Sequence, residues 1–173
     1  MRNKGYIQIY TGNGKGKTTA AIGLAVRAAG AGLKVFIGQF AKGSKCSEHK
    51  ALAKFAKNIR LKQYGGKCFI GRKHDAKDLA MARRGFEEIK RMVASGRYPL
   101  VILDEITTAN KYGFVTVDEV LMLIKSKPQH VELVLTGRNA DSELIKSADL
   151  VTEMKEVKHY FKRGVQARVG IEK

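Results

Sequence analysis

The alternation of short apolar runs with longer amphipathic stretches is the feature of this sequence that most restricts its fold. The apolar runs, several rich in Val and Ile, predict strands at residues 5–10, 35–39, 59–63, 100–103, 131–135 and 150–154. The amphipathic stretches predict helices at residues 18–29, 47–57, 75–95, 117–126 and 141–147. Strands that alternate with helices in this way predict an α/β fold, with a mostly parallel six-stranded sheet and helices on both faces.

Several predicted helices begin or end at residue types that are common at helix ends. Thr116 and Asp141 can each cap the helix that follows, and Pro128 follows the end of the fourth helix. At 173 residues the chain has the length of one domain, and we expect residues 1–173 to form it. The basic tail, residues 158–173, has no clear element and could be mobile in the free protein.

A glycine-rich loop, TGNGKGKTT at residues 11–19, lies between the first predicted strand and the first predicted helix. Its glycines leave backbone N–H groups free to converge on phosphate oxygens, and the helix N-terminus adds partial positive charge. Lys17 can reach phosphate oxygens, and the Thr18 hydroxyl is placed to bind Mg²⁺. The motif therefore predicts a P-loop nucleotide-binding fold of the RecA-like kind. The residues expected at the nucleotide are Gly12, Asn13, Gly14, Lys15, Gly16, Lys17, Thr18 and Thr19.

Two positions of the loop are unusual. The common pattern is G-x-x-x-x-G-K-[ST], and Thr11 stands where that pattern has its first glycine. Lys15 supplies one more cation for a polyanionic group. A small-molecule kinase would normally carry glycine at position 11, so a kinase is the weaker interpretation.

The run VILDE, residues 101–105, ends a predicted strand in two acids. P-loop proteins place at this point the carboxylate that reaches the Mg²⁺ shell. We therefore expect Asp104 and Glu105 to join Thr18 as candidate Mg²⁺ ligands. An ATP-hydrolysing motor would use Glu105 to polarise water, whereas a transferase could use it on the metal, and the motif leaves both open.

Two arginines are further candidates for contact with the nucleotide. Arg138 lies in TGRN, residues 136–139, and parallel strands would place it at the same end of the sheet as the phosphate loop. Arg27 lies late in the first predicted helix and has the weaker claim, because an ion pair on the helix surface suits that position better.

The net charge is compatible with an anionic partner, and equally with a lysine-rich solvated surface that has no partner. The chain has 33 Lys and Arg against 16 Asp and Glu, a formal net charge of +17 at pH 7. Such an excess attracts nucleic acid, anionic membranes or phosphorylated small molecules. The cations are spread along the chain, whereas a nucleic-acid arm would be clustered, so we expect no nucleic-acid partner. The sequence has no apolar stretch long enough for a membrane span and no secretory signal at its start, so we expect no membrane contact and a cytoplasmic location.

Five segments of the chain together resemble the P-loop ATP:corrinoid adenosyltransferases. They are TGNGKGKTTAA, the VxxxQFxKG pattern at residues 35–43, VILDEIT, TGRN, and the closing ADLVTEM with VKHYFKRGVQARVGIEK. The resemblance runs from about residue 5 to the C-terminus. The modified loop GNGKGKTT is far more specific than a general P-loop match, and the closing pattern strengthens the resemblance because other P-loop families do not share it.

The resemblance implies a transfer of the 5′-deoxyadenosyl group of MgATP to the Co(I) of a reduced corrinoid, in adenosylcobalamin synthesis or salvage. Co(I) is itself the nucleophile in that reaction and expels triphosphate from the 5′ carbon, so the protein supplies no nucleophile. By this resemblance, Lys17 stabilises the leaving group and residues 12–18 wrap the triphosphate. Thr18 and Glu105 would hold Mg²⁺, with Asp104 as the second candidate.

The resemblance also implies a homodimer and a loop on the corrinoid side. Some family members carry a sequence like GFTW there, and this chain has GKCF at residues 66–69. Phe69 would supply the aromatic surface, while Lys67 stands in place of an aromatic residue. The positive charge suits an acidic, flavodoxin-like reductant.

Two other functions remain open from the sequence. A nucleic-acid-stimulated P-loop ATPase would use the same loop and release ADP and phosphate. A nucleotide- or corrinoid-binding carrier would bind both ligands without forming a cobalt–carbon bond.

Overall fold

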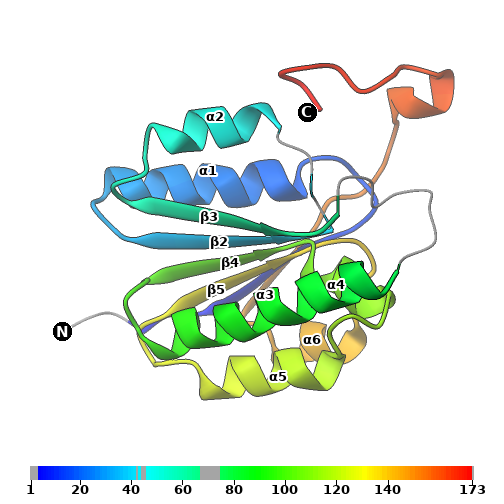
Figure 1. The fold of residues 1–173 in the computed structure, drawn as a ribbon. Helices are drawn as coiled ribbons and strands as arrows, with labels where there is room; N and C mark the ends of the chain where they lie inside the picture. Colours follow the sequence, from blue (N-terminus) through cyan, green and yellow to red (C-terminus); the bar gives the residue numbers. More distant parts are fainter. Residues whose placement is uncertain (1–3, 42, 44–45, 67–74, 173) are drawn as a thin grey trace.

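A six-stranded parallel sheet forms the centre of the protein (Figure 1). The computed structural model describes residues 4–41, 43, 46–66 and 75–172. The strands are β1 (Ile7–Thr11), β2 (Val35–Phe40), β3 (Ile59–Tyr64), β4 (Leu100–Asp104), β5 (Glu132–Thr136) and β6 (Leu150–Glu153), in the order β3-β2-β4-β5-β1-β6. Because every pair is parallel, the carboxyl ends of all six strands meet at one edge of the sheet.

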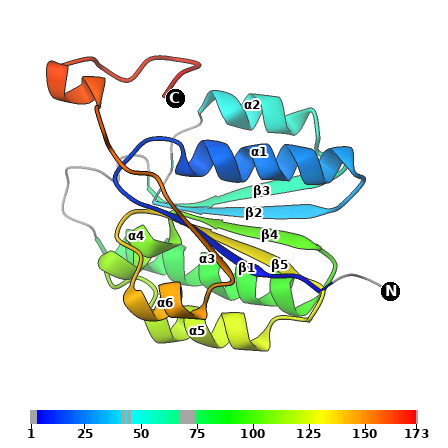
Figure 2. The same ribbon diagram turned by 180° about the vertical axis from the view of Figure 1, so that it is seen from behind.

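Helices cover both faces of this sheet (Figures 1 and 2). One face carries α1 (Lys17–Gly30) and α2 (Ser47–Ala53). The other face carries α3 (Ala76–Ala94), α4 (Ile106–Lys111), α5 (Val117–Ser126) and α6 (Ser142–Ser147). The predicted α/β fold with a parallel six-stranded sheet and two helical layers is therefore confirmed.

The burial of each strand follows from its place in the sheet. Every residue of β2 and of β4 is buried, because these strands lie inside the sheet and are covered on both faces. All four residues of β6, at one edge, are exposed. Two apolar clusters fill the space between the sheet and its helices, one with α3, α5 and α6 and one with α1.

The predicted helix starts are confirmed by capping hydrogen bonds. The Thr116 hydroxyl accepts from the backbone N–H of Glu119 at 3.2 Å. The Asp141 carboxylate accepts from the N–H of Glu143 at 2.8 Å. These side chains satisfy N–H groups that the first turn of a helix leaves unpaired.

Three predicted boundaries or loops were wrong. The helix predicted at residues 47–57 ends at Ala53, because the following N–H groups bond three residues back, as in turns, and the chain then enters β3. The short helix α4 was missed; it follows β4 directly, and its apolar residues are buried in the core. The tail predicted to lack an element contains a 3₁₀ turn, η1 (Tyr160–Arg163).

None of the helices in the described part of the chain combines the length and the apolar character that a membrane crossing requires.

We predict opposite effects of alanine at two helical glycines. A Cβ at Gly85 in α3 would lie 2.2 Å from Cγ of Tyr64, so Gly85→Ala should destabilise the protein by about 1–3 kcal/mol despite the better helix propensity of alanine. Gly23 in α1 has no atom within 4 Å of the same position, so Gly23→Ala should stabilise by up to about 1 kcal/mol. Thermal or urea unfolding measures both, and a destabilising effect of equal size in the two variants would contradict the packing described.

Candidate active site

The glycine-rich loop connects β1 to α1 at the carboxyl edge of the sheet, and it is packed against the chain that leaves β6. The N–H of Gly14 donates to the carbonyl oxygen of Met154 at 2.6 Å. A Cβ at Gly12 or Gly14 would lie 2.5 or 2.6 Å from that same oxygen, and Gly12 also has a φ of 97°. Both positions therefore need glycine for the close approach of another backbone, and Gly12 needs it for its backbone conformation as well.

Thr11 has a structural role at the start of the loop. Its side chain is buried, and its hydroxyl oxygen accepts a hydrogen bond from the N–H of Ala140 at 3.2 Å. This bond ties the phosphate loop to the segment between β5 and α6. A glycine at position 11 could not make it, which gives the unusual residue a physical reason.

Lys17 opens α1 and turns its ammonium group into the loop. Its Nζ donates to the carbonyl oxygens of Gly12 at 2.7 Å and Gly14 at 2.8 Å, and the residue is only 7% exposed. Burial lowers the pKa of the Lys17 ammonium, and Arg138 acts in the same direction, whereas the carboxylates of Glu105 and Asp104 oppose it. A polyphosphate bound nearby would favour the charged form of Lys17 and so oppose the effect of burial on its pKa.

Asp104 ends β4 and is held by donors from three other elements. The hydroxyls of Thr18 and Thr136 donate to its Oδ1 at 2.9 and 2.6 Å, and the Gln39 amide donates to its Oδ2 at 3.0 Å. The residue is 1% exposed. Both carboxylate oxygens therefore have a defined orientation beside the Thr18 hydroxyl.

Glu105 follows in a left-handed backbone conformation with a φ of 60°. This conformation is uncommon for a residue with a side chain. It is held by the Glu105 N–H, which donates to the Thr136 hydroxyl at 2.9 Å. The side chain accepts from the Thr108 hydroxyl at 2.6 Å and lines the cavity at the loop.

The donor set at this point fits a magnesium ion. Thr18 offers a hydroxyl oxygen, and Asp104 and Glu105 offer carboxylate oxygens. Mg²⁺ prefers hard oxygen ligands of this kind, in small number, together with substrate phosphates. The three residues come together from α1 and the end of β4, as the sequence predicted.

A cavity of about 610 Å³ opens over the loop. The predicted residues that line it are Gly14, Lys15, Gly16, Lys17, Thr18, Thr19, Glu105 and Arg138. Gly12 and Asn13 belong to the same loop, and Asp104 reaches the group through Thr18.

The remaining predicted residues are Arg27, Phe69 and Lys67. Arg27 is exposed in the last turn of α1, about 15 Å along the helix from Lys17, so the structure does not place it with the phosphate loop. Phe69 and Lys67, the predicted corrinoid-side residues, lie outside the described part of the chain.

Two segments that the sequence analysis did not assign to the nucleotide also line this cavity. One is the start of α2, and the other is the C-terminal segment above the phosphate loop. Their residues are Ser47, Glu48, Ala51, His159, Gly170, Ile171 and Glu172. For the C-terminal segment, the signal in the sequence was the closing pattern, which is part of the resemblance. Strand and helix periodicity cannot identify a segment that lacks regular structure.

The C-terminal segment is joined to the loop through Lys15. The Lys15 Nζ contacts the carboxylate of Glu172 at 2.9 Å and the hydroxyl of Tyr160 at 3.0 Å. Glu172 also accepts from the backbone N–H of Arg168 at 2.8 Å. Hydrogen bonds from Arg168, then Tyr160 and Lys15, hold the pKa of the Glu172 carboxyl well below its usual range. The cation predicted for a polyanion is thus paired with a carboxylate of the same chain.

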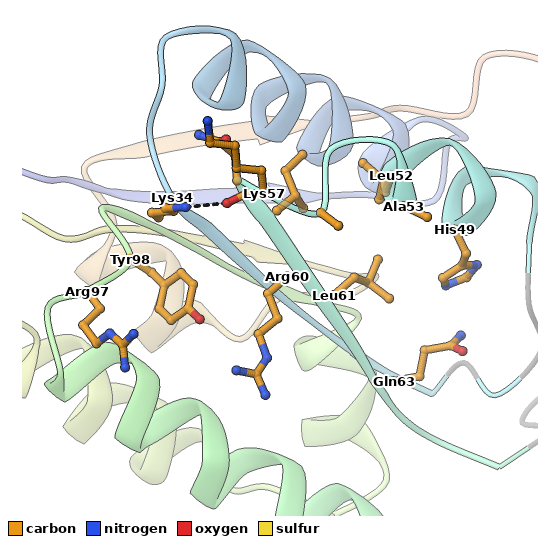
Figure 3. Close-up of a pocket in the computed structure, with 13 residues that line it drawn as sticks. Lys34, His49, Leu52, Ala53, Lys57, Arg60, Leu61, Gln63, Arg97 and Tyr98 are labelled. Carbon is orange, nitrogen blue, oxygen red and sulfur yellow. Dashed lines mark hydrogen bonds between the residues drawn. The ribbon is translucent and has the colours of Figure 1, made fainter.

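A larger cavity, of about 860 Å³, lies along the edge strand β3 (Figure 3). Its lining includes four cations, Lys34, Lys57, Arg60 and Arg97, and the ring of Tyr98. None of the described residues that line it belongs to the phosphate loop or to the acidic end of β4. The smaller cavity over the loop is therefore the better candidate for the active site, because it holds groups that the sequence predicts to bind phosphate and Mg²⁺.

Comparison with known proteins gives one consistent result. A family model for ATP:corrinoid adenosyltransferase BtuR/CobO/CobP matches residues 3–172. A corrinoid adenosyltransferase of Sinorhizobium sp is 39% identical over 172 residues, which cover 98% of this chain and 80% of that protein. A corrinoid adenosyltransferase of Escherichia coli is 34% identical over 169 residues, covering 98% of this chain and 86% of that protein.

We predict that Glu172 holds the C-terminal segment on the loop. Glu172→Gln removes the charge shared by Lys15 and Arg168, so trypsin should cleave within residues 158–172 roughly threefold faster or more, since charge-assisted hydrogen bonds are about twice as strong as neutral ones. Mass spectrometry of the fragments measures the rate. Glu143→Gln is the matched control, because the Glu143 carboxylate forms an exposed ion pair with Lys146 on α6, away from the C-terminal segment, and equal rates in the two variants would refute the prediction.

Proposed function

The chain belongs to the ATP:corrinoid adenosyltransferase family, and we propose how its residues serve that activity. The enzyme transfers the 5′-deoxyadenosyl group of ATP to a corrinoid, in cobalamin synthesis or salvage. One observation supports our site assignment above others: the phosphate loop, Glu105 and Arg138 line a single cavity. Membership of this family favours the transferase over the ATPase and carrier alternatives.

The proposed reaction needs no nucleophile from the protein. The electron pair of the corrinoid Co(I) forms the cobalt–carbon bond with the 5′ carbon of ATP. The bond between that carbon and the triphosphate oxygen breaks, and its electrons leave with triphosphate. The protein therefore has to hold the two reactants in line and to stabilise negative charge on the departing group.

Lys17 is the proposed stabiliser of the leaving group. Its ammonium lies inside the loop on the carbonyls of Gly12 and Gly14, where phosphate oxygens would be close to it. The N–H groups of the loop and the N-terminus of α1 would add donors and partial positive charge. Lys15 and Arg138 line the same cavity and would bring further cations to the triphosphate.

Thr18, Asp104 and Glu105 are the proposed holders of Mg²⁺. When bound, the ion neutralises phosphate charge and orients the leaving group. The contribution of the protein is the fixed arrangement of the oxygens, since the Asp104 carboxylate has three donors around it. Glu105 would supply a further carboxylate oxygen, and its side chain is oriented by the hydrogen bond that it accepts from the Thr108 hydroxyl.

The proposal extends to the partners of the enzyme. Phe69 and Lys67 remain the proposed corrinoid-side residues. Four large apolar side chains of the C-terminal segment are exposed, Val157, Phe161, Val169 and Ile171, which supports a homodimer that covers them. The net charge of +17 supports an acidic, flavodoxin-like reductant, and the need for ATP and for reduced cobalt supports a cytoplasmic location.

Replacement of Lys17 tests the site. Lys17→Ala should lower kcat by about 10²–10³-fold, because the departing triphosphate loses a charged donor. The assay is an anaerobic incubation with ATP, Mg²⁺ and a chemically reduced corrinoid, in which visible absorbance follows the cobalt–carbon bond and chromatography identifies the phosphate product. Arg27→Ala removes a cation from the same helix far from the cavity and should keep the wild-type rate. Near-normal turnover of Lys17→Ala, or release of ADP, would overturn the proposal.

Assembly and reductant can be tested in solution. Light scattering should give twice the chain mass of 19.1 kDa, and Phe161→Ser with Val169→Ser should shift the mass toward the monomer. Turnover with a protein reductant should fall as ionic strength rises, because salt screens attraction between opposite charges, while turnover with a chemical reductant should not. A monomeric wild type would contradict the proposed homodimer. Turnover with the protein reductant that does not change with ionic strength would contradict the proposed acidic reductant.

A further inference from the structure

A chain of hydrogen bonds runs from the start of α2 to the buried carboxylate of Asp104. The imidazole Nε2 of His49 lies 2.8 Å from the side-chain Oε1 of Gln39. The Nε2 of Gln39 donates to Asp104 Oδ2 at 3.0 Å. Gln39 and Asp104 are also register partners in the neighbouring strands β2 and β4. His49 is therefore linked to the Asp104 carboxylate by two hydrogen bonds, with the Gln39 side chain between them.

Which atom donates and which accepts in these hydrogen bonds follows from the backbone N–H of Cys46, which bonds to the other side of the His49 ring. The backbone N–H of Cys46 can only donate, and it points to Nδ1 of His49 at 2.8 Å. Nδ1 also lies 3.1 Å from the carbonyl oxygen of Cys46, but a proton on Nδ1 would face the Cys46 N–H at the shorter distance. We therefore assign Nδ1 as the acceptor, which places the ring proton on Nε2, where it is donated to the oxygen of Gln39. This leaves the amide nitrogen of Gln39, and not its oxygen, facing Asp104. With the opposite amide orientation, oxygen would face oxygen.

Gln39 has little freedom to find other partners. It is 0% exposed, so water cannot readily replace the bond from His49. If that bond is lost, the amide can turn, and the acceptor that would then face Asp104 repels the carboxylate. The orientation of Asp104 thus depends on the ring that orients Gln39.

We infer that His49 is a positioning residue for the metal site, acting through Gln39 on the carboxylate of Asp104. The inference rests on the proposed role of Asp104 at Mg²⁺. It differs from that proposal, since it assigns a role to a residue that holds no ligand and lies on another element. Side chains behind metal ligands typically change metal affinity by about 10–100-fold when they are replaced.

His49 could instead be a metal ligand itself, because its ring lies with Cys46 and Glu48 in a group whose donor atoms are within 4.8 Å of one another. The contacts favour the positioning role. Its Nδ1 is engaged by the Cys46 N–H and its Nε2 by Gln39, so neither nitrogen is directed at an ion. The ring also lines the cavity along β3, as Gln63 does (Figure 3).

Two substitutions separate positioning from support of α2. Asparagine can place an acceptor near the position of Nδ1, so His49→Asn should keep the cap on the Cys46 N–H and lose the bond to Gln39. Glutamine can place a donor near the position of Nε2, so His49→Gln should keep the bond to Gln39 and lose the cap. A purely structural histidine would make both variants alike in metal binding.

The experiment measures Mn²⁺, a paramagnetic substitute for Mg²⁺, by electron paramagnetic resonance in the presence of ATP and without a corrinoid, so that no turnover occurs. We expect His49→Asn to weaken Mn²⁺ binding about tenfold or more and His49→Gln to leave it within about twofold of the wild type. Asp104→Asn is the reference for loss of the carboxylate. Normal affinity of His49→Asn beside a weakened Asp104→Asn would overturn the inference, whereas normal affinity in both would overturn the assignment of Asp104 to the metal.

A second measurement needs no variant and no metal. Nitrogen-15 NMR of the imidazole in the wild-type protein reports which ring nitrogen carries the proton. We expect His49 as the neutral form protonated on Nε2. The form protonated on Nδ1 alone would break the chain at its first bond and overturn the inference.

Discussion

The rest of the site depends on the hydrogen bonds that the buried carboxylate of Asp104 accepts. Asp104 lies at the end of β4, in the interior of the sheet, and a carboxylate in that position without partners would cost several kcal/mol. Among the described residues, Thr18 of α1, Thr136 of β5 and Gln39 of β2 donate to it. Satisfying one buried charge therefore brings the first turn of α1 to the ends of the central strands, and it places the phosphate loop beside the acids.

The second constraint is the close approach of β6 to the phosphate loop. Because β1 pairs with β6 on one side and β5 on the other, the chain after β6 passes directly over the loop, and Met154 bonds to Gly14. The same path carries the C-terminal segment to the cavity, where Glu172 meets Lys15. The two ends of the sequence thus line one cavity, and the glycines of the loop serve the packing of the protein as well as the proposed binding of phosphate.

The parts of the fold that could be predicted have a local cause. Apolar periodicity identified all six strands, and Thr116 and Asp141 marked helix starts through bonds to N–H groups two or three residues away. The missed helix α4 has only six residues and begins at the left-handed Glu105, so burial against the core stabilises it more than its own sequence does. The contribution of α2 to the cavity was also missed, because it depends on how the chain returns between β2 and β3.

The sequence by itself determined the order of the elements, the phosphate loop, the acidic end of β4 and the family to which they belong. These follow from spacing along the chain and from motifs whose chemistry is local. Only the tertiary structure decided that Lys15 pairs with Glu172 and that His49 reaches Asp104 through Gln39. Both contacts depend on the strand order of the parallel sheet, which no short segment of the sequence specifies, because a hydrogen bond between residues far apart in the sequence forms only where the fold brings them together.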